Sequence, residues 1–209
     1  PTPAHAAAGD VCGPGAELVA TGICEQTYTS GTHTFTPTAE MSQLEVLLVG
    51  AGGAGAEQAD PNTNGYAAAG GGGEVTFIDA TGATDPLAIV VAQAGTDGSV
   101  SGGATGTARN GANGVSDDGG ASGNGYNGTS GLSDSDITWG SGAGAAGRPA
   151  NNQDGGAGVV VSAIVPTGSL FANDDRCFGG GGAIGTPTVR GVPGCGAGGP
   201  ADASGTLLA

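Results

Sequence analysis

The sequence predicts an all-β protein, a small β-sandwich with long glycine-rich loops that include short polyglycine-II stretches. Glycine supplies 47 of the 209 residues, against an average usage of about 7%. Between the glycines lie short apolar runs bounded by turn residues, a pattern typical of strands. Only one Trp, four Phe and three Tyr are available to fill an interior, so we expect a thin core and a chain dominated by loops.

Apolar or Thr-rich runs predict the strands in chain order. Thr and aromatic residues favour a strand over residues 28–36, which ends at Pro37. Leu44–Val49 is the strongest run, and Gly50 stops it. We expect a second pair of strands at Glu74–Ile78 and Leu87–Val91, joined by the turn residues Asp79–Pro86, and a last strand at Val159–Val165, closed by Pro166.

Glycine dominates the rest of the chain, with Gly95–Gly158 as its low-complexity centre. In several places glycine recurs at intervals of three, which is the repeat of polyproline II, and close packing of such helices requires glycine at the contact. We therefore expect short polyglycine-II stretches beside the β core; the alternative is irregular loops that are merely rich in glycine. The spaced residues are Gly125/Gly128/Gly131, Gly179/Gly182/Gly185 and Gly191/Gly194.

The charge balance excludes whole classes of partner. Four cationic residues, all Arg, face 19 acidic residues, for a net charge of −15. Nucleic acids require many phosphate-neutralising cations, and an anionic membrane surface would repel this chain. The acidity is typical of a secreted protein kept in solution by its charge; a high-salt habitat or binding of divalent cations are the alternatives.

Four cysteines form two local pairs in the sequence. Neither pair has the C-x2-C spacing of a zinc site. We therefore expect two disulfides, although three connectivities are formally open, and an oxidising, extracellular setting. The pairs are Cys12/Cys24 and Cys177/Cys195.

The start of the chain also indicates export. Ala4-His5-Ala6 has the A-x-A pattern of a signal-peptide cleavage site. We expect residues 1–8 to be a signal-peptide remnant and residues 9–209 to form one glycine-rich β domain, truncated at its C-terminus. No stretch is long and apolar enough to span a bilayer. The expected location is extracellular or on the cell surface, without membrane insertion.

One motif resembles a dinucleotide-binding fingerprint and fails on its context. Gly50-x-Gly52-x-x-Gly55 follows a predicted strand, but the fingerprint requires a helix after the third glycine to hold the pyrophosphate. Pro61 and the run Gly70–Gly73 would lie in that helix, where neither residue type is tolerated. We therefore expect no cofactor.

A second motif matches the opening of a calcium loop. Asp60, Asn62 and Asn64 have the spacing D-x-[DN]-x-[DN]-G. Position twelve, where a bidentate Glu is needed, is Gly71. These three residues are thus weak candidate calcium ligands, and solvated acidic turns are the alternative. Further acidic pairs in loops are Asp117/Asp118, Asp134/Asp136 and Asp174/Asp175.

The sequence contains few residue patterns typical of catalytic sites. His33 is the one histidine beyond the presumed leader, and it lies in a Thr-rich strand where a surface position is expected. No serine lies in the G-x-S-x-G elbow of a hydrolase. Paired carboxylates for glycoside hydrolysis remain open, but sugar-stacking aromatics are scarce. Asn127-Gly128-Thr129 is a lone glycosylation sequon. We expect a protein that is not an enzyme.

Three stretches together resemble a glycine-rich β domain of secreted actinobacterial surface proteins and phage tail-fibre adhesins. Ser30–Pro37 is similar to the opening S-G-T-x-T-F-T-x-P strand of that family, one residue short before the proline. Leu44–Val49 runs into the glycine run 50–55, and the run Gly70–Gly73 enters the next strand. The resemblance covers residues 28–95; the closing V-x-V strand of the family is missing before Ala209.

The resemblance implies a small β-sandwich whose glycine-rich loops gather at one end and carry recognition without catalytic residues. With the composition, it predicts a structural or adhesive component of a bacterial cell surface or extracellular matrix that contacts a surface polymer, a protein or itself. The alternatives are a phage-type receptor binder, an ice-binding module, or an accessory module of a secreted hydrolase, which would need aromatic carbohydrate platforms near Tyr66, Tyr126 or Trp139. The loop regions expected to bind are 50–73, 95–158 and 179–200.

Overall fold

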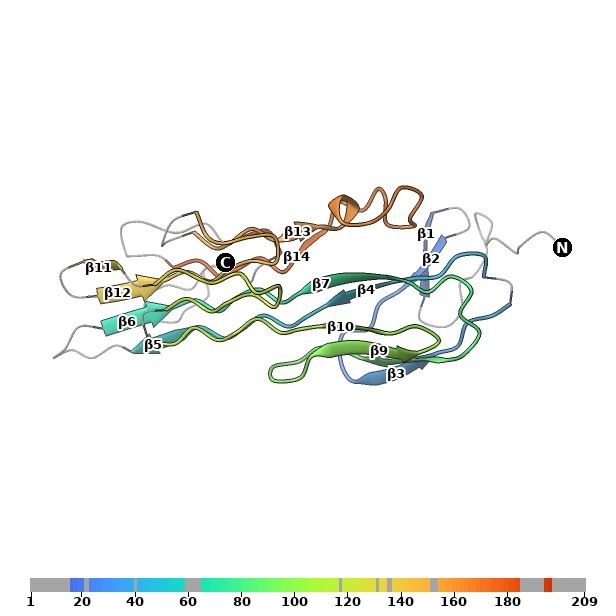
Figure 1. Ribbon diagram of the computed structural model, residues 1–209, viewed down its shortest axis with the longest axis horizontal. Helices are drawn as coiled ribbons and strands as arrows, with labels where there is room; N and C mark the ends of the chain where they lie inside the picture. Colours follow the sequence, from blue (N-terminus) through green and yellow to red (C-terminus); the bar gives the residue numbers. More distant parts are fainter. Residues whose placement is uncertain are drawn as a thin grey trace.

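The computed structural model shows an elongated molecule with β5, β6, β11 and β12 toward one end and the other labelled strands from the middle to the opposite end, and glycine-rich segments run between the two groups (Figure 1). It describes residues 16–20, 23–39, 41–58, 65–116, 118–130, 132–134, 137–150, 154–184 and 194–196. Apart from one short 3-10 helix, η1 (Val161–Ala163), all regular elements among these residues are strands. They are β1 (Ala16–Ala20), β2 (Ile23–Gln26), β3 (Thr32–Phe35), β4 (Glu45–Val49), β5 (Ala56–Gln58), β6 (Gly65–Ala68), β7 (Val75–Asp79), β8 (Leu87–Val90), β9 (Gly98–Gly102), β10 (Gly106–Ala108), β11 (Leu132–Asp134), β12 (Ile137–Gly140), β13 (Val159–Val160) and β14 (Cys177–Phe178).

The strands form small sheets, mostly antiparallel. One end of the molecule holds a four-stranded sheet in the order β10-β9-β8-β3 and the β4-β7 pair, and β13-β14 lies alongside the latter (Figure 1). The other end holds the sheet β11-β12-β6-β5, in which β12 and β6 run parallel. A separate hairpin, β1-β2, lies beside the first end. The predicted all-β class is confirmed.

The end that holds β3, β4 and β7–β10 is called the sheet-rich end below; β4 lies between two apolar clusters there, which explains the unbroken apolar run Val46–Val49 that follows Glu45. Val46 and Leu48 pack into a cluster with the four-stranded sheet. Leu47 and Val49 point to the opposite face and pack with Val75 and the β13-β14 pair. Because successive side chains of a strand alternate between faces, a strand covered on both faces needs apolar residues at every position.

The larger apolar cluster lies between β4-β7 and the four-stranded sheet. Leu87 is 0% exposed and Val100 1% exposed, and Phe35 and Ile78 pack against this cluster from β3 and β7. Burying a side chain of this size contributes about 1.5–3 kcal/mol. Two sheets that share such a cluster form the small sandwich expected from the sequence.

The predicted pairing of Glu74–Ile78 with Leu87–Val91 is wrong. β7 pairs with β4, with Val75 opposite Val49, whereas β8 pairs with β3 and β9. The two strands lie in different sheets because each turns an apolar face toward the same cluster. A direct hairpin would place both on one side of that cluster and leave the other side uncovered.

The strand predicted at Val159–Val165 is also wrong beyond Val160. The chain continues as η1, although Val161 N still donates to Arg176 O at 3.0 Å and Ser162 N to Asp174 O at 2.8 Å. Val161 is fully buried, and Ile164 N then turns back to Val161 O. In the partner segment Asp175 is skipped between these two contacts, and Arg176 and Asp174 bind each other, so the regular ladder ends there.

Several strands were not expected from the sequence. β9 and β10 lie in the low-complexity centre, as do β11 and β12, while β1 and β2 precede the first predicted strand. The sequences of β9, β10 and β11 are rich in Gly, Ser and Thr or are very short, so apolar alternation could not reveal these three.

Candidate functional site

Seven glycine-rich segments lie between the strands at the two ends of the molecule, and we call them together the glycine bundle. Six of them follow β4, β10, β12 or β14 or precede β7 or β13, and the seventh, 119–123, lies between β10 and β11 in the chain (Figure 1). The bundle consists of segments 50–55, 69–74, 109–114, 119–123, 140–145, 155–158 and 179–182.

Backbone hydrogen bonds in the bundle repeat every third residue. Gly50 N donates to Glu74 O and Gly53 N to Gly71 O, both at 2.8 Å. Residues three apart therefore meet the same neighbouring segment, which is the repeat of the polyproline II helix. The same interval relates the donors Gly111 and Gly114 (to Ala51 and Ala54), Gly120 and Gly123 (to Ala69 and Gly72), Ala69 and Gly72 (to Gly140 and Ala143), and Gly142 and Ala145 (to Gly182 and Gly179).

Segment 69–74 lies at the centre of this network. It exchanges hydrogen bonds of 2.8–3.1 Å with residues of the segments 50–55, 109–114, 119–123, 140–145 and 179–182. A strand inside a sheet has two hydrogen-bonded neighbours, one on each side. The central segment has five, some parallel and some antiparallel to it, so these segments form a bundle and not a further sheet.

The bundle interior is made of backbone. A Cβ on Gly72 would overlap the carbonyl oxygen of Gly179, and a Cβ on Gly73 would overlap that of Gly50. Neither glycine has a positive φ, so close approach, and not backbone conformation, requires glycine there. The other buried side chains in this region are small, such as Ala143 and Ser141, both 0% exposed.

The loop regions predicted to bind ligands are largely occupied by this packing. Residues 69–73, 120 and 140–145 are buried, whereas the exposed parts are turns and residues of the outer segments, such as 52, 54–55 and 112–113. One turn is closed by reciprocal hydrogen bonds between Val115 and Asp118, and another by Ser122 and Tyr126. Binding through these regions would therefore use the turns and the outer segments rather than the glycine runs themselves.

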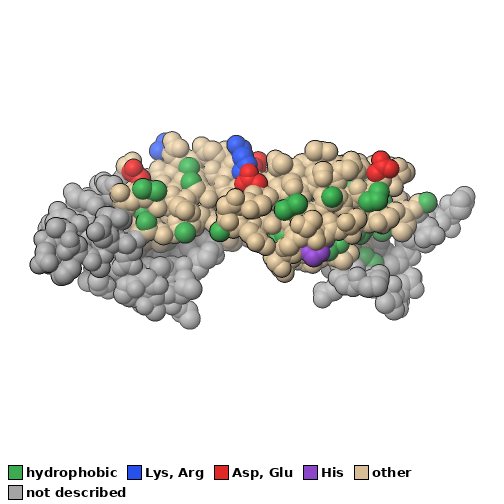
Figure 2. Space-filling view, turned by 90° about the horizontal axis from the view of Figure 1, so that it is seen from below, with side chains coloured by type: hydrophobic (Ala, Val, Ile, Leu, Met, Phe, Trp, Pro, Cys, Tyr) green, Lys and Arg blue, Asp and Glu red, His purple; other side chains and the backbone are tan. Residues whose placement is uncertain are grey.

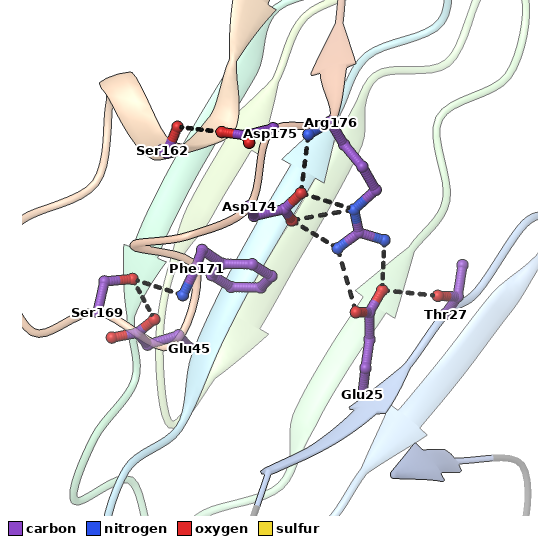
Figure 3. A network of polar contacts seen from close by, with 9 residues as sticks. All are labelled: Glu25, Thr27, Glu45, Ser162, Ser169, Phe171, Asp174, Asp175 and Arg176. Carbon is purple, nitrogen blue, oxygen red and sulfur yellow. Dashed lines mark hydrogen bonds and ion pairs between the residues drawn. The ribbon is translucent and has the colours of Figure 1, made fainter. Parts of the chain in front are cut away.

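An arginine clamp ties the N-terminal hairpin to the β13-β14 region (Figure 3). Arg176 Nη1 lies 2.6 Å from Glu25 Oε1 in β2, and its Nη2 lies 2.6 Å from Asp174 Oδ2. The hydrogen bonds from Arg176 lower the pKa of Asp174, and both carboxylates raise the pKa of Arg176. All three groups are satisfied by one another, so the clamp is a structural contact.

A second polar contact anchors the loop between η1 and β14. Glu45 Oε2 accepts from Ser169 Oγ at 2.6 Å and from Leu170 N at 2.9 Å (Figure 3). In the same loop, Phe171 packs edge-on against Phe77 with ring centroids 6.4 Å apart. Glu45 therefore serves loop attachment, and its carboxylate is engaged.

The structure contains the predicted disulfide between Cys177 and Cys195, with Cα atoms 5.6 Å apart. It returns residues 194–196 to segment 179–182, where Gly194 N donates to Gly181 O at 3.1 Å. Cys24 is also disulfide-bonded; its expected partner, Cys12, lies outside the described residues.

The candidate calcium ligands Asp60, Asn62 and Asn64 lie outside the described residues. Within the described part of the chain, no group of three or more His, Cys, Asp or Glu side chains is placed to hold a metal ion. Asp174, one of the acidic loop residues, is bound to Arg176. Asp118 is exposed.

His33 lies on the edge strand β3. Its ring stacks on Tyr28 with centroids 4.3 Å apart, and its Nε2 lies 2.6 Å from Ser30 O. Because a carbonyl oxygen can only accept, Nε2 carries the proton in this contact. The ring thus closes a local turn.

A polar hollow of about 280 Å³ opens beside the turn at Asp118. Its charged groups are Asp118 and Arg148, and sequence reasoning had not brought these two together. Arg148 takes part in none of the ion pairs seen among the described residues. The lining residues are Asp118, Gly119, Ala121, Asn127, Gly128, Thr129, Ser130 and Arg148.

Comparison with family models, curated proteins and solved structures gave no match for this chain. In the described residues, no helix has the length and apolar character needed to cross a membrane.

Proposed function

We propose that this protein is a secreted, non-enzymatic structural or adhesive component of a bacterial cell surface or extracellular matrix. The observation that supports this role most directly is the glycine bundle, in which each segment is fixed by backbone hydrogen bonds to several others. Such a bundle joins the two strand-bearing ends of an elongated molecule (Figure 1), as a spacer or fibre unit requires.

The composition of the surface supports a role in binding other surface molecules. On the face seen in Figure 2, charged side chains are few and most of the surface consists of backbone and small polar groups. The disulfide between Cys177 and Cys195 suits an oxidising compartment outside the cytosol. The resemblance of residues 28–95 to the glycine-rich β domain of secreted actinobacterial surface proteins and phage adhesins supports the same role.

Immunogold electron microscopy on intact cells of the source organism tests this proposal. Label along the cell wall or on filaments is the expected result. Label that is missing from the cells, with the protein free in the medium or on phage particles, would overturn it and favour the alternative of a receptor-binding or ice-binding module.

A further inference from the structure

Among the described residues no carboxylate pairs with Arg148, in contrast to Arg109 and Arg176. Arg109 Nε lies 3.0 Å from Glu74 Oε2, and Arg176 is held in its clamp. Acidic residues outnumber cations 19 to 4 in this chain, so an arginine would be expected to find one of them. Arg148 instead lines the hollow with an exposed guanidinium.

The backbone around the hollow is fixed without using its charged groups. Asp118 N and O are bound to Val115 at 2.9 and 3.0 Å, which positions the turn and leaves the carboxylate exposed. Across the hollow, Thr129 Oγ1 accepts from Ser141 N at 2.9 Å. Gly119 N donates to Thr129 O at 2.9 Å. A site whose frame is held independently of its binding groups loses little entropy when a ligand enters.

The lining chemistry selects the class of ligand. No large apolar side chain contributes, which excludes lipids and aromatic molecules, since sites for these are mostly apolar. An anion would be attracted by Arg148 but repelled by Asp118 and by the net charge of −15 of the chain. A cation would meet Asp118 but also Arg148. A neutral ligand with several hydroxyl groups can donate to the carboxylate and accept from the guanidinium at once.

We propose that this hollow binds one neutral sugar residue of a polysaccharide. Asp118 accepts hydrogen bonds from sugar hydroxyls, Arg148 donates to ring or hydroxyl oxygens, and the amide of Asn127 can do both. The volume of about 280 Å³ lies just below the range of about 300–1,000 Å³ of small-molecule sites, which suits a single ring. This inference rests on the proposed adhesive role and gives it a ligand class.

The test uses the purified, disulfide-intact chain on an array of immobilised neutral and uronic-acid-containing glycans, followed by calorimetric titration with the best free oligosaccharide. The variants are Asp118→Ala and Arg148→Ala, with Asp85→Ala as the matched control because Asp85 is exposed and outside the hollow. Urea unfolding of each variant verifies that the fold is kept.

We expect at least one neutral glycan to bind, and both hollow variants to weaken binding by about tenfold or more, the loss of one charge-assisted hydrogen bond. Asp85→Ala should bind like the wild type. Absence of binding to every neutral glycan, binding only to acidic glycans, or binding that neither hollow variant weakens would overturn the inference. Cell-wall labelling by immunogold would stand in each of those cases, so the two proposals can fail separately.

Discussion

The sheet-rich end and the glycine bundle are stabilised in opposite ways. At the sheet-rich end, large side chains such as Leu87 and Val100 fill the space between layers, so removing atoms opens cavities. In the bundle, carbonyl groups pack directly against glycine Cα atoms, as at Gly72, so adding atoms forces backbones apart. The comparison teaches that an interior of side chains is destabilised mainly by substitutions that remove atoms, whereas an interior of backbone is destabilised mainly by substitutions that add them.

The largest effect is expected from truncation at the sheet-rich end. Leu87→Ala should lower the free energy of unfolding by about 3 kcal/mol, because it removes methyl groups from a fully buried position and leaves a cavity. Val115→Ala, next to bundle segment 109–114, should change the free energy of unfolding by less than about 0.5 kcal/mol, since Val115 is 65% exposed. Urea titration measures both. Equal losses would contradict the comparison.

Loss of the disulfide at the edge of the bundle should have a comparable effect. The Cys177→Ser/Cys195→Ser double variant opens a loop with a sequence separation of 18, for which loop-closure entropy gives about 3 kcal/mol. Hydrogen exchange at Gly181, which donates to Gly156, should accelerate more than exchange at Ile89 in β8. An unchanged urea midpoint would show that the disulfide does not hold the bundle together.

Adding one methyl group inside the bundle should cost about 2 kcal/mol, the usual range for overpacking. Gly72→Ala places a Cβ on the carbonyl of Gly179, a backbone atom that can move only with its whole segment. Gly147→Ala is the matched control, because no atom lies within 4 Å of its Cβ position and its φ is not positive. That control should be neutral or stabilising by up to about 1 kcal/mol. If the two glycines tolerate alanine equally, the backbone-packed interior is wrong.

The smallest effect concerns the arginine clamp and its pH dependence. Asp174→Asn should cost about 1 kcal/mol at neutral pH, since its side chain is only 12% exposed beside Arg176. The pKa of Asp174 is lowered in the folded state, so its contribution is complete above the ordinary carboxyl pKa of about 3.9 and is lost as pH falls through the lowered value.

Urea midpoints measured from pH 7 to pH 2 test this sign. Wild type and Asp174→Asn should converge in acid. Asp175→Asn should follow the wild type throughout, because among the described residues the Asp175 carboxylate accepts only a long hydrogen bond, from Ser162 Oγ at 3.4 Å. A difference that grows in acid would contradict the assigned direction.

The sequence predicted where several strands lie, but it did not predict which strands pair with one another. The run Leu44–Val49 predicts β4 because its packing leaves a local apolar signature. The partner of a strand leaves no such mark, which is why β7 was paired with the wrong strand. The strand predicted at Val159–Val165 was wrong for a similar reason, because the place where its ladder ends is set by residues of another segment, Asp174 and Arg176.

In the bundle the spacing signal existed but did not identify the segments. The three-residue interval between Gly179 and Gly182 is used in contacts with segment 140–145, whereas Gly125 has a φ of 86° and forms a turn. In a chain with 47 glycines, such intervals also arise by chance. The hollow could not be predicted from the sequence at all, because Asp118 and Arg148 belong to no shared motif and are brought to one hollow only by the fold.

The central position of segment 69–74 also sets an order of events in time. Its hydrogen-bond partners begin at Gly50 and extend to Gly182, so most of them are synthesised after it. Pairing over such separations is slow, since each distant closure loses chain entropy before it gains contacts. While the chain is still emerging, the middle of the molecule has no neighbours to hold it. We expect the strands around β4 to become native first and the glycine bundle to close last, once nearly the whole chain has arrived.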